Sequence, residues 1–406
     1  MRGTKVLISG ASIAGPALAF WLHRFGADVT VVERAPSPRP GGQAVDIRGV
    51  ARRAVELMGL EPSVRAACTE TGGLSFVDRY GRTLSTQTAD SYGGDGLIAE
   101  YEILRGDLAE VFLTATRDDV NYVFGDRITA LDERDDGVHV TFERGEEERF
   151  DVVIGADGLH SGVRALVFGE ESRFLRHLGM YLSFWSAENT FGLENWAIGY
   201  DEPGRGAGLR TIHDNTQVMV YLSYRSAAVE YDYRDIERQK DLVRAGAAGM
   251  AWQTPNLIAR LDEASDFFFD SCSQVVLESW SKGRIGLLGD AAFCASPISG
   301  QGTSLAIVGA YILAGELAAA EGDHAAGLRA YEHRMRAWVD LTQRFGRSNL
   351  KLMQPMTKAG IWLRNQLMRV LPLLPGKLLM SGNLRKVFNG IELPDYRHLL
   401  VGSQGP

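Results

Sequence analysis

Residues 10–15, Gly-Ala-Ser-Ile-Ala-Gly, form a glycine-rich turn whose spacing could hold the phosphates of a dinucleotide. The turn matches the pattern G-x-G-x-x-G except that Ser12, a small residue that still permits close approach, replaces the middle glycine. Gly10 would make the tight turn, and Gly15 would allow close packing of a helix whose N-terminus offers free N–H groups to phosphate. Glu33, 23 residues after Gly10, would accept hydrogen bonds from an adenosine ribose, with Arg34 beside it in the same site.

The elements around this turn are predicted to be a strand, a helix and a second strand. Residues 5–9 are a short apolar run typical of a buried strand, and residues 18–25 repeat apolar side chains at helical spacing. A second apolar run, residues 29–32, leads to the ribose-binding acid. This order favours nucleotide binding over a hydrolase nucleophile elbow at Ser12, because Ala14 occupies the second glycine position of that motif.

Two later segments repeat the arrangement of a buried strand that ends on an acid. Residues 151–158 contain Asp157, and residues 283–290 end on Asp290. An acid at such a position can hold cofactor hydroxyl groups, while the neighbouring glycines let the backbone approach a ligand. A break rich in proline and glycine at residues 36–42 interrupts the chain where an NAD dehydrogenase would continue with further β-α-β units. We therefore favour a flavin dinucleotide over NAD.

The loop after the second acid precedes a predicted helix, residues 303–317. Reduced flavin carries negative charge on its pyrimidine side, so a helix N-terminus aimed there would stabilise the reduced cofactor. Cys294 lies in this loop, and we interpret it as a small, partly buried residue, with a redox thiol as the alternative.

In their order, the three motifs resemble those of the class A flavin monooxygenases of the para-hydroxybenzoate hydroxylase type, over most of residues 4–350. The resemblance implies non-covalent FAD, with Arg105 at its ribityl or phosphate region. The residues expected to line the isoalloxazine are Pro297, Gly300, Gln301 and Gly302. The sequence departs from the family pattern at two positions. Ser12 replaces the middle glycine, and Phe293 lies where many members have histidine.

Within the family, residues 41–49, 102–108 and 299–302 are most similar to the tetracycline-inactivating flavin monooxygenases. This similarity implies that Asp46 and Arg48 lie beside FAD. It also implies that Arg39 lies on a loop that meets the nicotinamide cofactor, NADPH or NADH. The alternative for all three charged residues is a solvated loop.

The mechanism that the family implies is reduction of FAD by NADPH or NADH, followed by reaction with O2 to a flavin C4a-hydroperoxide. Transfer of one oxygen atom to an aromatic or polycyclic phenolic substrate, such as a tetracycline, would complete the reaction. The sequence leaves two alternative functions open. One is a flavoenzyme of the same fold that does not insert oxygen, and the other is a non-catalytic, flavin-binding redox sensor.

The expected fold is α/β, with a Rossmann-type FAD-binding domain, an inserted and mostly antiparallel β-sheet that binds substrate, and C-terminal helices. The FAD-binding domain is predicted to comprise residues 1–75, 99–172 and 276–325, the substrate-binding domain residues 76–98 and 173–275, and the C-terminal helical segment residues 326–406. No internal repeat divides the chain further.

Short runs of aromatic or β-branched residues predict the strands of the substrate sheet, at residues 181–185, 207–213, 217–224 and 267–276. A planar organic substrate would gain from burial among such side chains. The candidates for lining its pocket are Ser183, Trp185, Arg210, His213 and Tyr221. A purely structural role stays open for each of them, because one sequence does not fix which face of a strand meets the flavin.

Composition limits the other classes of function. The net charge of −8 and a pI near 5.6 give no general attraction for nucleic acid. The three dispersed cysteines fit a reducing cytoplasm, and no histidine spacing predicts a metal site. Residues 360–380 are too interrupted by charge and proline to span a bilayer. They are expected to pack on the protein, with a helix on a membrane surface as the alternative.

Overall fold

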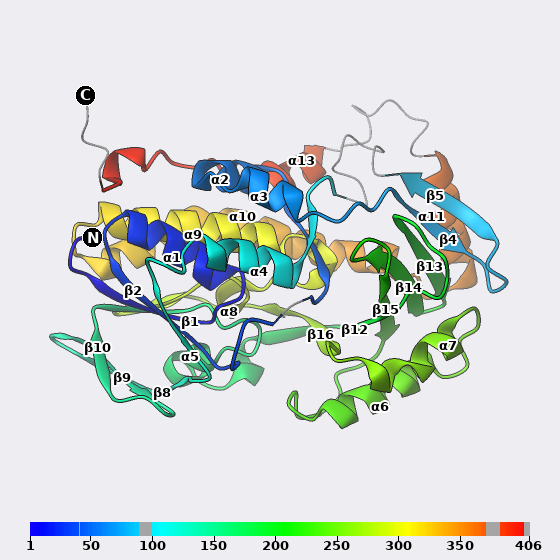
Figure 1. Ribbon diagram of the computed structural model, residues 1–406, viewed down its shortest axis with the longest axis horizontal. Coiled ribbons are helices and arrows are strands. Elements are labelled where there is room, and N and C mark those ends of the chain that lie inside the picture. The colour runs from blue at the N-terminus through cyan, green and yellow to red at the C-terminus, as the bar shows by residue number, and fades with distance from the viewer. Residues whose placement is uncertain (40, 89–98, 371–381, 402–406) are drawn as a thin grey trace.

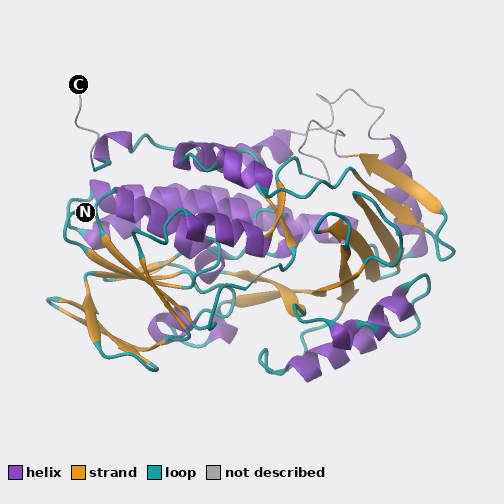
Figure 2. Ribbon diagram, viewed as in Figure 1, coloured by secondary structure: helices purple, strands orange, loops and turns teal. Residues whose placement is uncertain are grey.

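The computed structural model describes residues 1–39, 41–88, 99–370 and 382–401. Two β-sheets lie at opposite ends of the molecule, and two long helices run from one sheet toward the other (Figure 1, Figure 2). Predictions for residues 89–98 and 371–380 fall outside the described residues. The predicted α/β fold class is confirmed.

A six-stranded sheet contains the glycine-rich turn. Its order is β17 (Ser281–Lys282), β18 (Ile285–Leu287), β11 (Val152–Gly155), β1 (Lys5–Ser9), β2 (Asp28–Glu33) and β7 (Asn121–Phe124). All neighbours pair in parallel except β17, which is antiparallel to β18. The strands are short and apolar because helices and a second small sheet cover both faces. The carboxyl ends of β1, β11 and β18 thereby bring the three predicted motifs to one edge.

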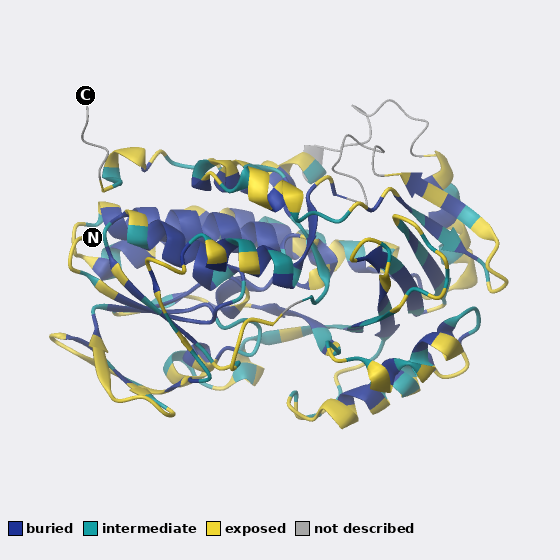
Figure 3. Ribbon diagram, viewed as in Figure 1, coloured by how far each residue is buried: buried dark blue, intermediate teal, exposed yellow. Residues whose placement is uncertain are grey.

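Helices α1 (Ala14–Arg24), α9 (Gly302–Ala319) and α10 (His324–Met353) pack as a layer over this sheet. Among the described residues, α9 alone is long and apolar enough to span a membrane, yet 89% of it is buried inside the protein. Figure 3 shows α9 as an almost continuously buried helix. It is the core of this domain, which explains why it has no polar face.

Smaller elements complete the cofactor side. They are α5 (Gly162–Phe168) and α8 (Asp290–Phe293), and a three-stranded sheet of β8 (Ile128–Arg134), β9 (Gly137–Phe142) and β10 (Glu148–Phe150). On the helical side lie α2 (Val50–Met58), α3 (Glu61–Ala66), α4 (Arg105–Thr114) and α13 (Gly382–Asn389). The two-stranded sheet of β3 (Ala44–Asp46) and β6 (Glu102–Leu104) lies beside the N-terminal end of α9.

The second large sheet has seven strands. Its order is β16 (Phe268–Val275), β12 (Leu175–Glu188), β15 (Gln217–Arg225), β14 (Arg205–Ile212), β13 (Trp196–Glu202), β4 (Gly73–Val77) and β5 (Thr83–Thr88). Every pairing is antiparallel except that of β13 with β4. Helices α6 (Ile236–Ala247) and α7 (Thr254–Ala259) cover one face, while α11 (Lys358–Val370) packs on β5 and β13.

All four strands predicted for the substrate sheet are present, as β12, β14, β15 and β16. Helices α6 and α7 and the β8–β10 sheet were not predicted. The proposed domain boundaries remain a prediction, and two of them fall inside an α-helix or a strand. The boundary after residue 75 lies within β4, and the boundary after residue 325 lies within α10.

Candidate cofactor and substrate site

The glycine-rich turn has a geometry that side chains would block. Gly10 has a φ of 108°, and a Cβ atom there would lie 2.6 Å from the carbonyl oxygen of Ala156. A Cβ atom on Gly15 would lie 1.9 Å from the carbonyl oxygen of Gly10. Both glycines are therefore required for α1 to begin directly above the end of β1, where its free N–H groups can meet phosphate.

Glu33 closes this turn from the end of β2. One carboxylate oxygen accepts a hydrogen bond from the Ala11 backbone N–H (2.9 Å), and the other accepts one from Ala35 N–H (2.9 Å). A carboxylate has about four acceptor positions, so Glu33 keeps capacity for ribose hydroxyl groups. Arg34 is exposed, and its guanidinium lies 5.9 Å from the ring centroid of Tyr233.

A pocket opens beside the turn and gathers several predicted cofactor residues. Its lining residues are Ala11, Ser12, Glu33, Ala35, Ser37, Pro38, Arg39, Arg105, Ala109 and Phe124. Arg105 donates a hydrogen bond to Ser12 Oγ (2.9 Å). Burial, and then the neighbouring Arg39, lower the pKa of Arg105. Because burial and Arg39 disfavour the charge on Arg105, a bound phosphate would stabilise that charge.

Asp157 lies directly behind the glycine-rich turn, and its contact with the cofactor stays a prediction. Its carboxylate accepts hydrogen bonds from Ser161 Oγ and from the Val163 backbone N–H (3.1 Å), at the start of α5. The backbone of Asp157 lies against the turn, since a Cβ atom on Gly10 would lie only 3.0 Å from Asp157 Cα. These hydrogen bonds fix Asp157 in the wall behind the glycine-rich turn and leave acceptor capacity on its carboxylate.

The third motif meets the N-terminus of α9. Asp290 is exposed to solvent, but the protein around it raises the pKa of its carboxyl by desolvation. A Cβ atom on Gly302, the first residue of α9, would lie 3.8 Å from Asp290 Oδ1. Pro297 begins the 3-10 turn that precedes the helix. A Cβ atom on Gly300 would likewise lie 3.9 Å from Asp46 Oδ2.

Asp46 and Arg48 lie against this helix N-terminus. The Arg48 guanidinium donates to Asp46 Oδ2 (2.9 and 3.1 Å), and the Arg48 backbone N–H donates to Ser304 Oγ (3.2 Å). Within the described part of the chain, the buried atoms Arg48 Nη1 and Gln301 Oε1 have no hydrogen-bond partner. An unpaired buried donor and an unpaired acceptor are costly unless a ligand uses them. These residues fit a flavin ring, which presents both acceptors and a donor along its edge.

The Asp46–Arg48 pair continues into the substrate sheet. Glu102 on β6 lies opposite Asp46 on β3 in the antiparallel register. Its Oε2 lies 2.6 Å from Arg210 Nη1 on β14. Burial acts to lower the pKa of Arg210, but Glu102 and Asp46 more than offset it and raise the pKa. Desolvation also raises the pKa of Asp46. The four residues form one charge network from the cofactor side to the seven-stranded sheet, in which Arg48 and Glu102 are buried and Asp46 and Arg210 are half-buried. Sequence reasoning missed Glu102, which it treated only as part of a similar stretch.

The five predicted substrate residues do not share a wall. Arg210 and Tyr221 lie on the face of the sheet that meets the charge network, as does Phe184, which is paired with Tyr221. Ser183 and Trp185 alternate with Phe184 and point to the other face, where Trp185 is 1% exposed in the core under α6 and α7. The prediction of a common pocket is therefore wrong for Ser183 and Trp185. His213 lies just beyond β14 in an exposed turn, with a φ of 50°.

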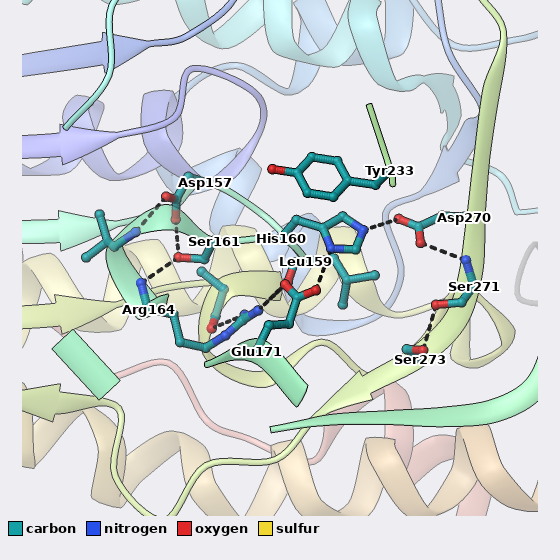
Figure 4. A network of polar contacts seen from close by, with 12 residues as sticks. Asp157, Leu159, His160, Ser161, Arg164, Glu171, Tyr233, Asp270, Ser271 and Ser273 are labelled. Carbon is teal, nitrogen blue, oxygen red and sulfur yellow. Dashed lines mark hydrogen bonds and ion pairs between the residues drawn. The ribbon is translucent and has the colours of Figure 1, made fainter. Parts of the chain in front are cut away.

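A second polar network, not predicted, joins the cofactor domain to the edge of the substrate sheet (Figure 4). His160 Nδ1 lies 2.9 Å from Glu171 Oε1, and His160 Nε2 forms an ion pair with Asp270 Oδ2 on β16 at 3.2 Å. The imidazole stacks on Tyr233, with centroids 4.5 Å apart and an interplanar angle of 4°. Burial alone would lower the pKa of His160, but Asp270 and Glu171 raise it to about 10.

Arg164 extends this network to the third motif. It is fully buried, donates to the Ala291 carbonyl in α8 (3.0 Å) and pairs with Glu171 at 2.9 Å. Nothing in a single sequence marks His160 or Arg164 as partners of residues so distant along the chain. Cys294 is buried nearby, and burial raises the pKa of its thiol well above its usual value, which agrees with a structural residue. No cluster of metal-ligating side chains occurs in the described ranges.

Comparison with known proteins agrees with this geometry. Residues 3–345 match the family model described as an FAD binding domain. A flavin-dependent monooxygenase from an unknown prokaryotic organism is 36% identical over 97% of this chain and 99% of its own length. An uncharacterised protein of Mycobacterium tuberculosis is 43% identical over 83% of this chain and 91% of its own length.

Among solved structures, the tetracycline destructase Tet(55) aligns with 98% of this chain and 100% of its own, at 35% identity and a TM-score of 0.84. Both required glycines, the paired arginines and the helix N-terminus with unpaired polar atoms fit FAD. The chain belongs to the FAD-binding-domain family of flavin-dependent monooxygenases.

Proposed function

We propose that this chain holds FAD non-covalently, takes electrons from NADPH or NADH, and inserts one oxygen atom of O2 into an aromatic or polycyclic phenolic substrate. The observation that carries the proposal is the charge network of Asp46, Arg48, Glu102 and Arg210. It lies between the N-terminus of α9 and one face of the seven-stranded sheet. In that position it would join the proposed cofactor site to the proposed substrate surface.

FAD would supply the redox chemistry and the activated oxygen, since no side chain of this chain can do so. The protein's own part is binding and orientation. Arg105 would neutralise the pyrophosphate, and the N-terminus of α9 with Arg48 would stabilise negative charge on the reduced ring. Arg39, at the mouth of the same pocket, is the proposed contact for the nicotinamide cofactor. We place the protein in the cytoplasm because its described cysteines are free.

The proposed substrate is a fused polycyclic phenol of the tetracycline type. Arg210 keeps its charge, so it can orient an enolate or phenolate oxygen. Burial raises the pKa of Tyr221, so its hydroxyl stays protonated and can donate a hydrogen bond. Extended similarity to a tetracycline destructase supports this substrate class over a small aromatic acid. A small acid would use Arg210 as a carboxylate partner instead.

The test is incubation of the FAD-loaded enzyme with tetracycline, NADPH and oxygen. We expect substrate-stimulated NADPH oxidation, a change in the drug's absorbance and a product heavier by about one oxygen atom, about 16 Da. Hydroxylation of a small phenolic acid without any change in tetracycline would reject the polycyclic substrate. Release of peroxide without an oxygenated product would show a flavoenzyme that does not insert oxygen. Bound FAD without any turnover would show a redox sensor.

A further inference from the structure

Helix α11 is attached to the protein by a side that contains Arg364, Asn365 and Met368. Arg364 is 4% exposed, pairs with Asp201 of β13 at 2.6 Å and lies 4.3 Å above the ring of Phe76. Asn365 is buried beside it, and the backbone carbonyl of Met368 accepts a hydrogen bond from Gln87. A helix on a protein surface normally buries its apolar side, whereas two of the three buried residues of α11, Arg364 and Asn365, are polar and the third is Met368.

The outward side of α11 is apolar. Trp362 and Leu363 are each 63% exposed, and Leu367 and Val370 are exposed on the same side. Met356, just before the helix, is also exposed. Of the 13 large hydrophobic residues that are exposed among the described residues, six lie between residues 352 and 370. Such a concentration marks an interaction surface, whereas single exposed apolar residues do not.

The sequence on either side of this helix is also unusual in its charge. Residues 341–391 contain nine Lys and Arg residues and no Asp or Glu, in a chain that has 51 acidic residues and a net charge of −8. Lys358 and Arg369, both exposed, lie three helical turns apart along one edge of the apolar side of α11. An apolar stripe with Trp and Leu, bordered by basic residues, is the composition of a helix that lies in a membrane interface.

We propose that the outer side of α11, formed by Trp362, Leu363, Leu367 and Val370, docks on an anionic lipid bilayer. Arg364 and Asn365 hold the helix to the enzyme, so insertion of the apolar side needs no unfolding. Lys358 and Arg369 would lie at the level of the lipid phosphates.

A second copy of this chain is a poorer occupant of the same surface. A stable dimer buries about 800 Å² from each partner, which is more than one side of a 13-residue helix provides. A two-fold interface would also place the basic border against its own copy, which is repulsive.

The experiment is flotation of the purified, FAD-loaded protein with phosphatidylcholine vesicles and with vesicles that also contain phosphatidylglycerol. We expect binding to the anionic vesicles only, and weaker binding at high salt because the charge attraction is screened. The variant Trp362→Ser/Leu363→Ser should bind roughly 10-fold or more weakly. Lys358→Glu/Arg369→Glu should lose the preference for anionic lipid. The control is Tyr80→Ser, which removes an exposed aromatic ring in the β4–β5 turn and should bind as wild type.

Light scattering after size-exclusion chromatography completes the design. Failure of the wild type to float with anionic vesicles would overturn the proposal, as would equal binding by the Trp362→Ser/Leu363→Ser variant. A dimer that this variant converts to monomers, without any vesicle binding, would identify a second copy as the occupant. Unchanged FAD absorbance and melting temperature in each variant would show that the fold is intact. The result does not depend on the substrate proposed above.

Discussion

The two faces of the seven-stranded sheet are built from the same strands but contain different chemistry. The face under α6 and α7 is a hydrophobic core in which Trp185 and Tyr181 pack with aliphatic residues. The opposite face carries Arg210, which pairs with Glu102, and Asp201, which pairs with Arg364. Residues next to each other in a strand therefore contribute to stability on one face and to the candidate site on the other. Strand phase, and not residue type, decides which role a residue has.

The largest expected effect tests the core face. Trp185→Ala should lower the free energy of unfolding by about 3–5 kcal/mol, because it leaves a large cavity. The folded enzyme should keep its substrate KM, since Trp185 does not face the site. Urea unfolding and steady-state kinetics at low temperature measure the two quantities, with Trp362→Ala as the exposed control. A raised KM without lost stability would contradict the separation of the faces.

The edge strand β16 provides the next test, through His160. The pKa of His160 is about 10 in the folded protein and about 6.5 when unfolded. Its stabilising effect is therefore complete below pH 6.5 and disappears as the pH rises toward 10. We expect His160→Gln to be destabilised by about 2–4 kcal/mol at pH 6.5, because each unit of pKa shift is worth about 1.4 kcal/mol.

The difference in unfolding free energy between wild type and His160→Gln should shrink at pH 8 and nearly vanish near pH 10. Urea titrations at three pH values measure this trend. The exposed His398 offers a matched control, since His398→Gln lies outside the network. A constant difference at every pH would show that the imidazole is not charged between its two carboxylates.

Arg210→Gln tests the site face. A hydrogen bond to a charged group contributes about 1.5–3 kcal/mol, so the KM for the substrate should rise about 10- to 100-fold. Stability should fall less than in Trp185→Ala. Arg205→Gln is the control, because Arg205 lies on the same strand but faces α6 and pairs with Glu202. Equal effects of the two substitutions would remove Arg210 from the substrate site.

The smallest effect is expected for Ser183→Ala. Its hydroxyl donates only to the Leu222 carbonyl (3.3 Å) within the core face. We expect a loss of about 0.5–1.5 kcal/mol in unfolding free energy and an unchanged KM. A change in KM would mean that Ser183 reaches the substrate after all, and the two faces would then not be separate.

The cofactor side could be predicted from the sequence because its information is local. The turn at residues 10–15, the following helix and Glu33 lie within one contiguous β-α-β unit, and steric demands fix the glycines. The face assignment of β12 could not be predicted. Its register with β16 shifts between His177 and Tyr181, so alternation counted from one end of the strand fails at the other. His160 also needed the structure, since Asp270 is distant in sequence.

The wide spacing of the strands in the six-stranded sheet has a consequence for biosynthesis. β1 lies at residues 5–9, whereas β18 forms from residues 285–287, and α9 follows it. A nascent chain shorter than about 320 residues, as it leaves the ribosome, therefore exposes the apolar surface of β11 and α1 that these later elements cover. The cofactor site cannot close before that length is synthesised. FAD can therefore act only late in folding, by stabilising a nearly complete chain.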